Sequence, residues 1–165
     1  MNKLVELVGK QASYPAVQAF LSLAKLPLRP EIPHDDSSVY LNKESVGLSA
    51  LFKEADYVAE EHGLTIEGGA PILAAIFLFG PGDDDFTAYQ GALLNEISFH
   101  MDRAAITSHL GPSVLFDEEF NTEAWDIEKG VRIFLDYDDA RQQVRLIQVG
   151  LTPASWPAPI DDATR

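Results

Sequence analysis

Val131–Tyr137 (VRIFLDY) and Val144–Leu151 (VRLIQVGL), with DDAR at 138–141 in the connection between them, decide the fold class of this chain. In the first segment the alternation of residues places Ile133 on one face and Phe134 on the other. Such a period of two is expected of a strand with one face in a core. The Asp-rich connection is typical of a hairpin turn. These residues therefore predict an antiparallel β-hairpin.

More strands are expected upstream. Residues 71–79 (PILAAIFLF) are short, apolar and rich in β-branched and aromatic side chains, which favours a central strand with both faces covered. Residues 39–43 and 46–52 predict two shorter strands around a turn at 45–47. Residues 55–69 are acidic and glycine-punctuated, and they predict either a strand edge or a short helix followed by a loop.

Two helices are expected. The first covers residues 13–24, with Ser13 as its N-cap and a proline in its first turn. The second begins after Asp102, which is expected to cap it, and ends before Gly111. His109 lies on the apolar side of this second helix, so we expect a core or boundary position for its ring.

The two halves of the chain share an order of elements, with a helix first, then a short strand, a glycine-marked hairpin and a further apolar strand. This pattern predicts two tandem α-β repeats, at about 10–80 and 97–151, within one domain of residues 1–151. A proline-rich tail, 152–165, follows. The predicted fold class is α+β, an antiparallel β-sheet with helices packed on one side.

The charge of the chain limits its partners. Among 165 residues, 26 are Asp or Glu and 12 are Lys or Arg, which gives a net charge of −14. Such a field repels nucleic acid and anionic lipid, and it accelerates encounters with a basic protein. We therefore expect a basic protein partner, no nucleic acid and no membrane.

The chain has no cysteine, which is compatible with a reducing compartment. The first residues contain no apolar run long enough for a signal peptide, and the longest apolar run, at 72–79, is too short to cross a bilayer. Cytoplasmic localisation is the prediction.

No catalytic pattern emerges. Ser49 lies in a GLSAL stretch that lacks the second glycine of a nucleophile turn. The histidines have no paired spacing on a helix, and Asp83–Asp85 does not follow the EF-hand pattern. The prediction is a non-enzyme without metal or cofactor. Two alternatives stay open: a metal-dependent hydrolase with His34, Asp35 and Asp36 among its ligands, and a non-catalytic envelope-assembly or scaffold module.

Recognition is the remaining chemistry. Interfaces combine a few aromatic anchors with complementary charge, and three places in this chain combine carboxylates with aromatic residues. The predicted partner-binding residues are Asp83, Asp84, Asp85, Phe86 and Tyr89; Asp35, Asp36 and Tyr40; and Asp136 and Asp138, beside Tyr137.

The second half also resembles a known group of proteins, through five stretches in a fixed order: ISFHMDRAAI (97–106), HLGP (109–112), WDI (125–127), YD (137–138) and VRLI (144–147). It is similar to bacterial toxin-immunity modules, whose build resembles the tandem helix–sheet repeats of beta-lactamase-inhibitor proteins. The resemblance implies a cognate antitoxin that forms a heterodimer with a secreted toxin, delivered by a type VI or contact-dependent system. Immunity proteins to nucleases are commonly acidic because they cover a basic active site, which implies a nuclease inhibitor here.

Overall fold

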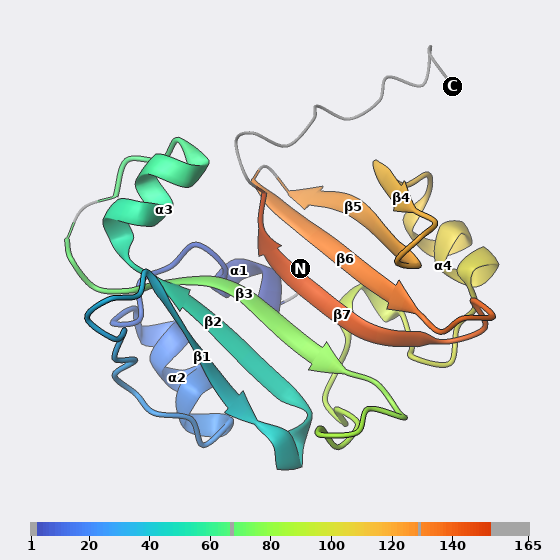
Figure 1. Cartoon of the computed structure of the whole chain (residues 1–165), viewed down its shortest axis with the longest axis horizontal. Helices are drawn as coiled ribbons and strands as arrows, with labels where there is room; N and C mark the ends of the chain where they lie inside the picture. The colour runs from blue at the N-terminus through green and yellow to red at the C-terminus, as the bar shows by residue number, and fades with distance from the viewer. Residues whose placement is uncertain (1–2, 67, 129, 153–165) are drawn as a thin grey trace.

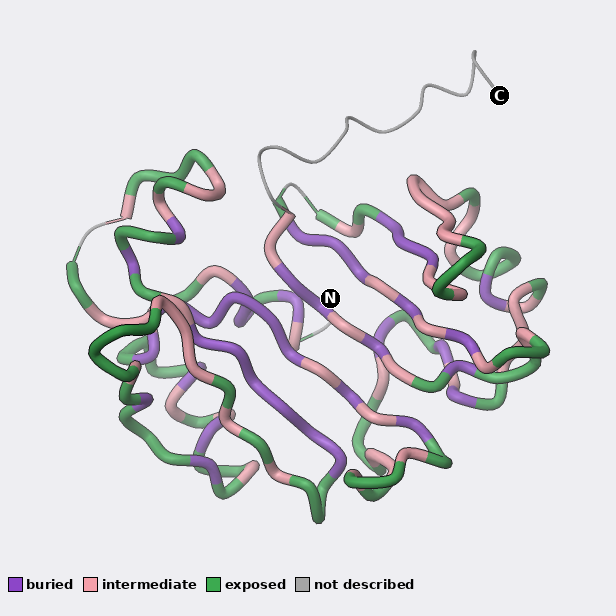
Figure 2. Tube along the Cα trace, viewed as in Figure 1, coloured by how far each residue is buried: buried purple, intermediate pink, exposed green. Residues whose placement is uncertain are grey.

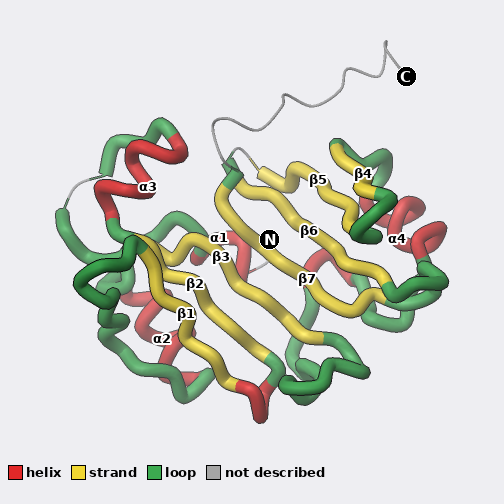
Figure 3. Tube along the Cα trace, in the orientation of Figure 1, coloured by secondary structure: helices red, strands yellow, loops and turns green. Residues whose placement is uncertain are grey.

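The structure, a computed structural model, describes residues 3–66, 68–128 and 130–152. It contains one seven-stranded antiparallel sheet with the order β1-β2-β3-β7-β6-β5-β4 (Figure 1). The expected α+β class, with an antiparallel sheet and helices packed mainly on one side, is confirmed. The strands are β1 (Ser38–Lys43), β2 (Leu48–Lys53), β3 (Ile72–Phe79), β4 (Leu115–Asp117), β5 (Thr122–Glu128), β6 (Val131–Tyr137) and β7 (Val144–Leu151). The helices are α1 (Lys3–Leu7), α2 (Pro15–Leu23), η1 (Glu44–Val46), α3 (Ala55–His62), η2 (Leu94–Glu96) and α4 (Arg103–Leu110) (Figure 3).

The hairpin predicted at the C-terminal end is β6 and β7, paired from Val131 with Leu151 to Tyr137 with Val144, with a register shift between Asp136 and Tyr137. Ile133 is buried against the helices, and Phe134 lies half-buried on the other face. The alternation that predicted this strand is therefore confirmed.

β3 is central, as expected, and the prediction that both of its faces are covered holds along Ile72–Ile76, which are all buried. It fails at the end of the strand. There Leu78 is buried in the core on the helix side, whereas Phe77 and Phe79 on the other side are only half-buried, because large aromatic side chains can also line a half-covered face. β3 pairs with β7 from Ala75–Gly150 to Phe79–Leu146, and this pair joins the two halves of the sheet.

The helix ends follow the expected chemistry in one case and not in the other. Asp102 caps α4, since its Oδ1 accepts a hydrogen bond from the Ala105 amide at 2.8 Å. Ser13 does not cap α2: the N-cap is Tyr14, without a side-chain bond, and Pro15 takes the first helical position. Proline fixes the helical φ there and has no amide hydrogen, so this start is stable without a polar cap. Of the two readings of residues 55–69, the helix is correct, as α3.

The core lies on one side of the sheet. Val5 of α1, Leu21 of α2 and Ile106 of α4 pack in a single cluster with inward residues of the strands, such as Phe52 and Ile133. Buried residues follow the strands in Figure 2. Within the described residues, no helix is long and apolar enough to cross a membrane. The predicted tail, apart from Thr152, lies outside the described residues.

Candidate functional site

The sheet face opposite the core is called the open face here. The register places Tyr40, Leu51 and Ala75 side by side on it, and Phe77 is beside Gln148. The Tyr40 and Phe77 rings are 5.9 Å apart and inclined by 50°. The residues that define the open face are Tyr40, Leu51, Lys53, Ala75, Phe77, Phe79, Arg132, Phe134, Asp136, Leu146, Gln148 and Gly150. It is an aromatic surface in the middle of the sheet, half-buried along much of its length (Figure 2).

Helix α3 closes one end of the open face. Ala55 and Val58 pack with Ile72 of β3 in a small buried cluster. Lys53 of β2 reaches the helix and donates a hydrogen bond to Glu61 Oε2 at 2.8 Å. The helix therefore forms a wall at the end of the sheet where β2 ends and β3 begins.

The other end of the sheet carries four connections, which together are called the acidic rim. The pairings Lys43–Leu48, Phe79–Leu146, Thr122–Asp136 and Tyr137–Val144 put them at the same end (Figure 1). The rim consists of residues 44–47, 80–90, 118–121 and 138–143, with eight acidic residues and one basic residue, a net charge of −7 out of −14. Half of the surplus negative charge thus borders one end of the open face.

Hydrogen bonds join the four rim connections into two pairs. The Thr87 amide donates to the Glu44 carbonyl at 2.9 Å, which links 80–90 to 44–47. Arg141 Nε donates to Asn121 Oδ1 at 2.9 Å, and the Tyr137 amide donates to the Asn121 carbonyl at 2.9 Å, which link 138–143 to 118–121. Gly47 lies under the first pair at φ 74°, and a Cβ there would overlap the Thr87 carbonyl oxygen. The rim is therefore an ordered structure.

The triple-aspartate loop is organised by its first carboxylate. Asp83 Oδ1 accepts hydrogen bonds from the amides of Asp85 and Phe86, both at 2.9 Å. The turn leaves Asp84 and Asp85 exposed and directs the Phe86 ring onto Phe79, where the two rings stack 3.8 Å apart. Asp83 thus has a structural role, and its two neighbours project their charge into solvent.

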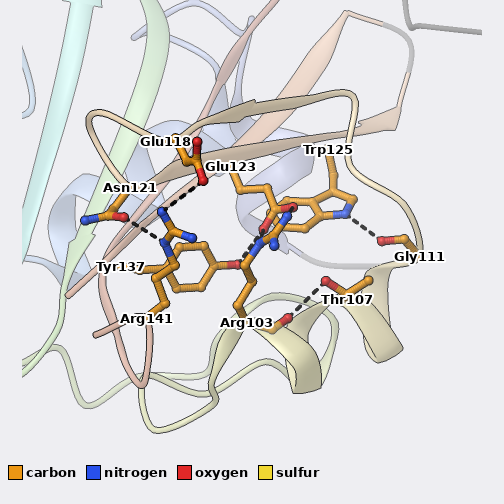
Figure 4. A network of polar contacts seen from close by, with 9 residues as sticks. All are labelled: Arg103, Thr107, Gly111, Glu118, Asn121, Glu123, Trp125, Tyr137 and Arg141. Atoms are coloured by element: carbon orange, nitrogen blue, oxygen red, sulfur yellow. Dashed lines mark hydrogen bonds and ion pairs between the residues drawn. The ribbon is translucent and has the colours of Figure 1, made fainter. Parts of the chain in front are cut away.

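A buried polar network supports the other pair of rim connections (Figure 4). Glu123 of β5 is 1% exposed and receives two hydrogen bonds of 3.1 Å from the Arg103 guanidinium of α4. Tyr137 donates a third, at 3.0 Å. The bonds to Glu123 raise the pKa of Arg103, and burial, together with the Glu123 charge, raises the pKa of Tyr137. The network therefore keeps a charged pair and a neutral phenol, and it fixes α4 against β5 and β6.

Further contacts extend this network. The Phe116 ring contacts two guanidinium groups, with its centroid 3.9 Å from Cζ of Arg103 and 4.9 Å from Cζ of Arg141. Trp125 Nε1 donates to the Gly111 carbonyl at 3.0 Å, which ties the end of α4 to β5. These contacts are structural, because each uses its donor or ring to join two elements of the same domain.

Asp136 lies in β6 at the border of the open face and the rim. Its Oδ1 accepts a hydrogen bond from Thr122 Oγ1 at 2.8 Å. Burial raises the pKa of Asp136, and the Thr122 bond and the Arg145 charge oppose this only in part. The residue is a half-buried carboxylate that a partner cation would stabilise.

Tyr89 lies on the helix side of the sheet. It lines an apolar groove of about 1470 Å³ between α1, α2 and residues 87–92, and burial raises its pKa. Tyr89 therefore does not share a surface with the exposed carboxylates that precede it in the sequence.

The structure thus separates the predicted partner-binding residues into four places: the acidic rim, the open face, the opposite end of the sheet and, for Tyr89, the groove on the helix side. Asp83, Asp84, Asp85 and Asp138 belong to the acidic rim, and Phe86 covers its border with the open face. Tyr40 and Asp136 lie on the open face. Asp35 and Asp36 lie at the opposite end, since Ser37 accepts a hydrogen bond from the Glu54 amide where α3 begins. Tyr137, which the sequence placed beside these carboxylates, is 4% exposed and points into the core.

The other chemical candidates have ordinary environments. Ser49 is buried and donates to Asn42 at 2.6 Å. His109 is exposed, so its expected core or boundary position was wrong; Ile106 fills the core below α4 instead. Within the described residues, no three His, Asp or Glu side chains are close enough to hold a metal ion.

Sequence reasoning missed the Glu123 network and the burial of His62, whose side chain is 5% exposed. The burial of Glu123 could have been predicted from the sequence. Glu123 precedes Trp125 by two residues in the same strand, so both side chains point to the same, inward face of the sheet. An inward carboxylate in a strand needs a cation nearby.

Comparison of the chain with models of protein families, with curated proteins and with solved structures gave no match.

Proposed function

We propose that this protein is an immunity protein, which binds a cognate secreted bacterial toxin with a basic active site, a nuclease, and blocks it. The observation that carries the proposal is the acidic rim beside the open face. It combines eight acidic residues and one basic residue with an aromatic surface that includes Tyr40 and Phe77.

This combination matches what a protein interface requires. Aromatic side chains supply binding energy when they are desolvated at the centre of a contact. Charges at the border raise the association rate with an oppositely charged partner and select against others. A nuclease holds phosphates with Lys and Arg, so its active-site cleft is complementary to the rim.

The proposed geometry places the open face against the toxin and the rim against its phosphate-binding residues. Asp84 and Asp85 are exposed, whereas Asp83 is occupied by its own turn. The two exposed carboxylates are therefore the ones available to the toxin.

The test is inhibition of the toxin encoded in the adjacent reading frame. Purified chain is expected to block its activity at a one-to-one ratio, with an association rate that falls as salt increases. The double variant Asp84→Lys/Asp85→Lys changes the charge by four units and keeps the Asp83 turn. We expect it to slow association about tenfold or more at low salt.

Asp35→Lys/Asp36→Lys is the matched control, because it makes the same change of charge at the opposite end of the sheet. It is expected to slow association much less. Equal effects of the two variants would refute the role of the rim, and a chain that leaves the toxin fully active would refute the proposed function.

The two alternatives gain no specific support. A metal-dependent hydrolase would need ligands beside His34, Asp35 and Asp36, and the described residues contain no group that could hold a metal. An envelope-assembly module would not need the concentration of carboxylates at one end of the sheet.

A further inference from the structure

A small pocket lies on the open face beneath the end of α3. Its volume is about 130 Å³, and it is lined by Lys53, Glu61, His62, Ala75, Gln148 and Gly150 among others. Ala75 and Gly150, two small residues in this lining, are directly paired in the sheet. The polar groups project from the wall made by α3 and from the neighbouring strands.

His62 presents a buried nitrogen without a hydrogen bond. Its side chain is 5% exposed, and its Nδ1 lies 3.0 Å from the Thr152 carbonyl oxygen. A carbonyl oxygen only accepts, so Nδ1 carries the hydrogen and Nε2 of the neutral ring is an acceptor. Among the described residues, Nε2 has no hydrogen-bond partner.

The nearest group to Nε2 is another acceptor. Glu61 Oε2 lies 3.2 Å away and already receives the Lys53 hydrogen bond. Burial raises the pKa of Glu61, but the hydrogen bond and charge of Lys53, joined by His62 when its ring is protonated, lower the pKa overall. The site therefore places a carboxylate oxygen 3.2 Å from an imidazole nitrogen, and no described residue donates a hydrogen bond to both.

Two events can satisfy this pair of acceptors. His62 can take up a proton, in which case Nε2 donates to Glu61. Alternatively, a donor from outside enters the pocket and bonds both acceptors. A buried, unsatisfied acceptor weakens the free protein, so filling it adds to the affinity for the group that does so.

We propose that this pocket receives an arginine guanidinium of the basic partner, which donates to His62 Nε2 and to Glu61. The proposal rests on the proposed function, because it names the group with which a basic toxin would anchor on the open face. A guanidinium carries several N–H donors in one plane and can bond two neighbouring acceptors at once, whereas an ammonium acts as a point charge. Its flat shape also suits a lining that includes the small residues Ala75 and Gly150.

The test is a titration of the full chain with N-acetyl-arginine amide, followed by the NMR signals of the His62 ring. The expected result is a saturable shift of these signals, with binding at least about fivefold weaker for N-acetyl-lysine amide, because the ammonium lacks the planar fork. Glu61→Gln is expected to weaken the arginine probe about tenfold, since it removes a charge-assisted bond. Glu60→Gln, an exposed position on the same helix, is the matched control and should leave binding unchanged.

A His62 signal that responds to pH but not to the arginine probe would overturn the proposal, because protonation alone would then satisfy the pair. Equal binding of the arginine and lysine probes would overturn it as well. Either result leaves the proposed function intact if Asp84→Lys/Asp85→Lys still slows association with the toxin. The two failures are therefore distinguishable.

Discussion

Phe86 stacks on Phe79, with ring centroids 3.8 Å apart and planes inclined by 8°. Phe79 is the last residue of β3, and Phe86 follows the three aspartates. The stack therefore anchors the most acidic loop of the protein to the end of the open face. Its removal should affect the loop first and the rest of the sheet less.

We predict that Phe86→Ala destabilises the fold by about 1–2 kcal/mol, from lost burial and the lost ring pair. Amide exchange should accelerate at Thr87 and Tyr89, whose hydrogen bonds to Glu44 and Phe79 hold the loop. Urea denaturation and hydrogen exchange measure the two effects. Phe120→Ala is the control, because Phe120 is 70% exposed. Equal destabilisation by both variants would contradict the role of the stack.

Asp83 is expected to act through hydrogen bonds within its own loop. Asp83→Ala removes the acceptor for the amides of Asp85 and Phe86 and should cost about 1 kcal/mol. Asp83→Asn keeps an oxygen in the same place and should restore most of the stability. Asp84→Ala, at an exposed position, should have little effect in the same denaturation experiment. If Asp83→Asn lowered the stability as much as Asp83→Ala, the effect would depend on the charge of Asp83 and not on its hydrogen bonds, which would disprove this account.

Local pattern predicted most of the fold. The period of two in β6 and the polar turn after it are short-range signals, so this hairpin was visible in the sequence. β4 was missed because three residues, Leu115–Asp117, are too few to establish a period. The pairing of β3 with β7 could not be predicted, since it joins segments about 70 residues apart and depends on the packing of the whole sheet.

The candidate site was predictable in kind but not in arrangement. The aspartates at 83–85 and at 138–139 were visible in the sequence, but their position at the same end of the sheet follows from strand register. His62 contacts Thr152 across 90 residues, and no local signal near either residue indicates this. Residues that are brought together by topology are therefore the ones that sequence reasoning missed.

Glu123 is expected to be the most sensitive polar position of the protein. Glu123→Ala leaves Tyr137 and Arg103 without their shared acceptor, and it should cost about 2–4 kcal/mol. Glu123→Gln should lie between Ala and the native residue, because its amide oxygen still accepts. Glu128→Ala, exposed in the same strand, is the control. The midpoint of urea denaturation ranks the stabilities of these variants. A decrease in the free energy of unfolding of less than about 1 kcal/mol for Glu123→Ala would contradict the proposed role of the network.

Asp136 should make the stability depend on pH in a defined direction. Burial raises the pKa of Asp136 above its ordinary value of 3.8, so the native state binds its proton more tightly than the unfolded state does. Ionisation of Asp136 therefore costs stability. The cost is absent below pH 3.8, where both states are protonated, and it is complete once the pH exceeds the folded-state pKa.

Asp136→Asn cannot ionise and can still accept the Thr122 hydrogen bond, so we expect this variant to be more stable than the native protein at neutral pH. The difference should shrink as the pH falls toward 3.8. Melting temperatures of both proteins between about pH 4 and pH 7 measure it. Asp139→Asn, at an exposed position in the neighbouring turn, should follow the native curve. A difference that stays constant with pH, or a native protein that is the more stable one at neutral pH, would mean that burial of the carboxylate is not what shifts its titration.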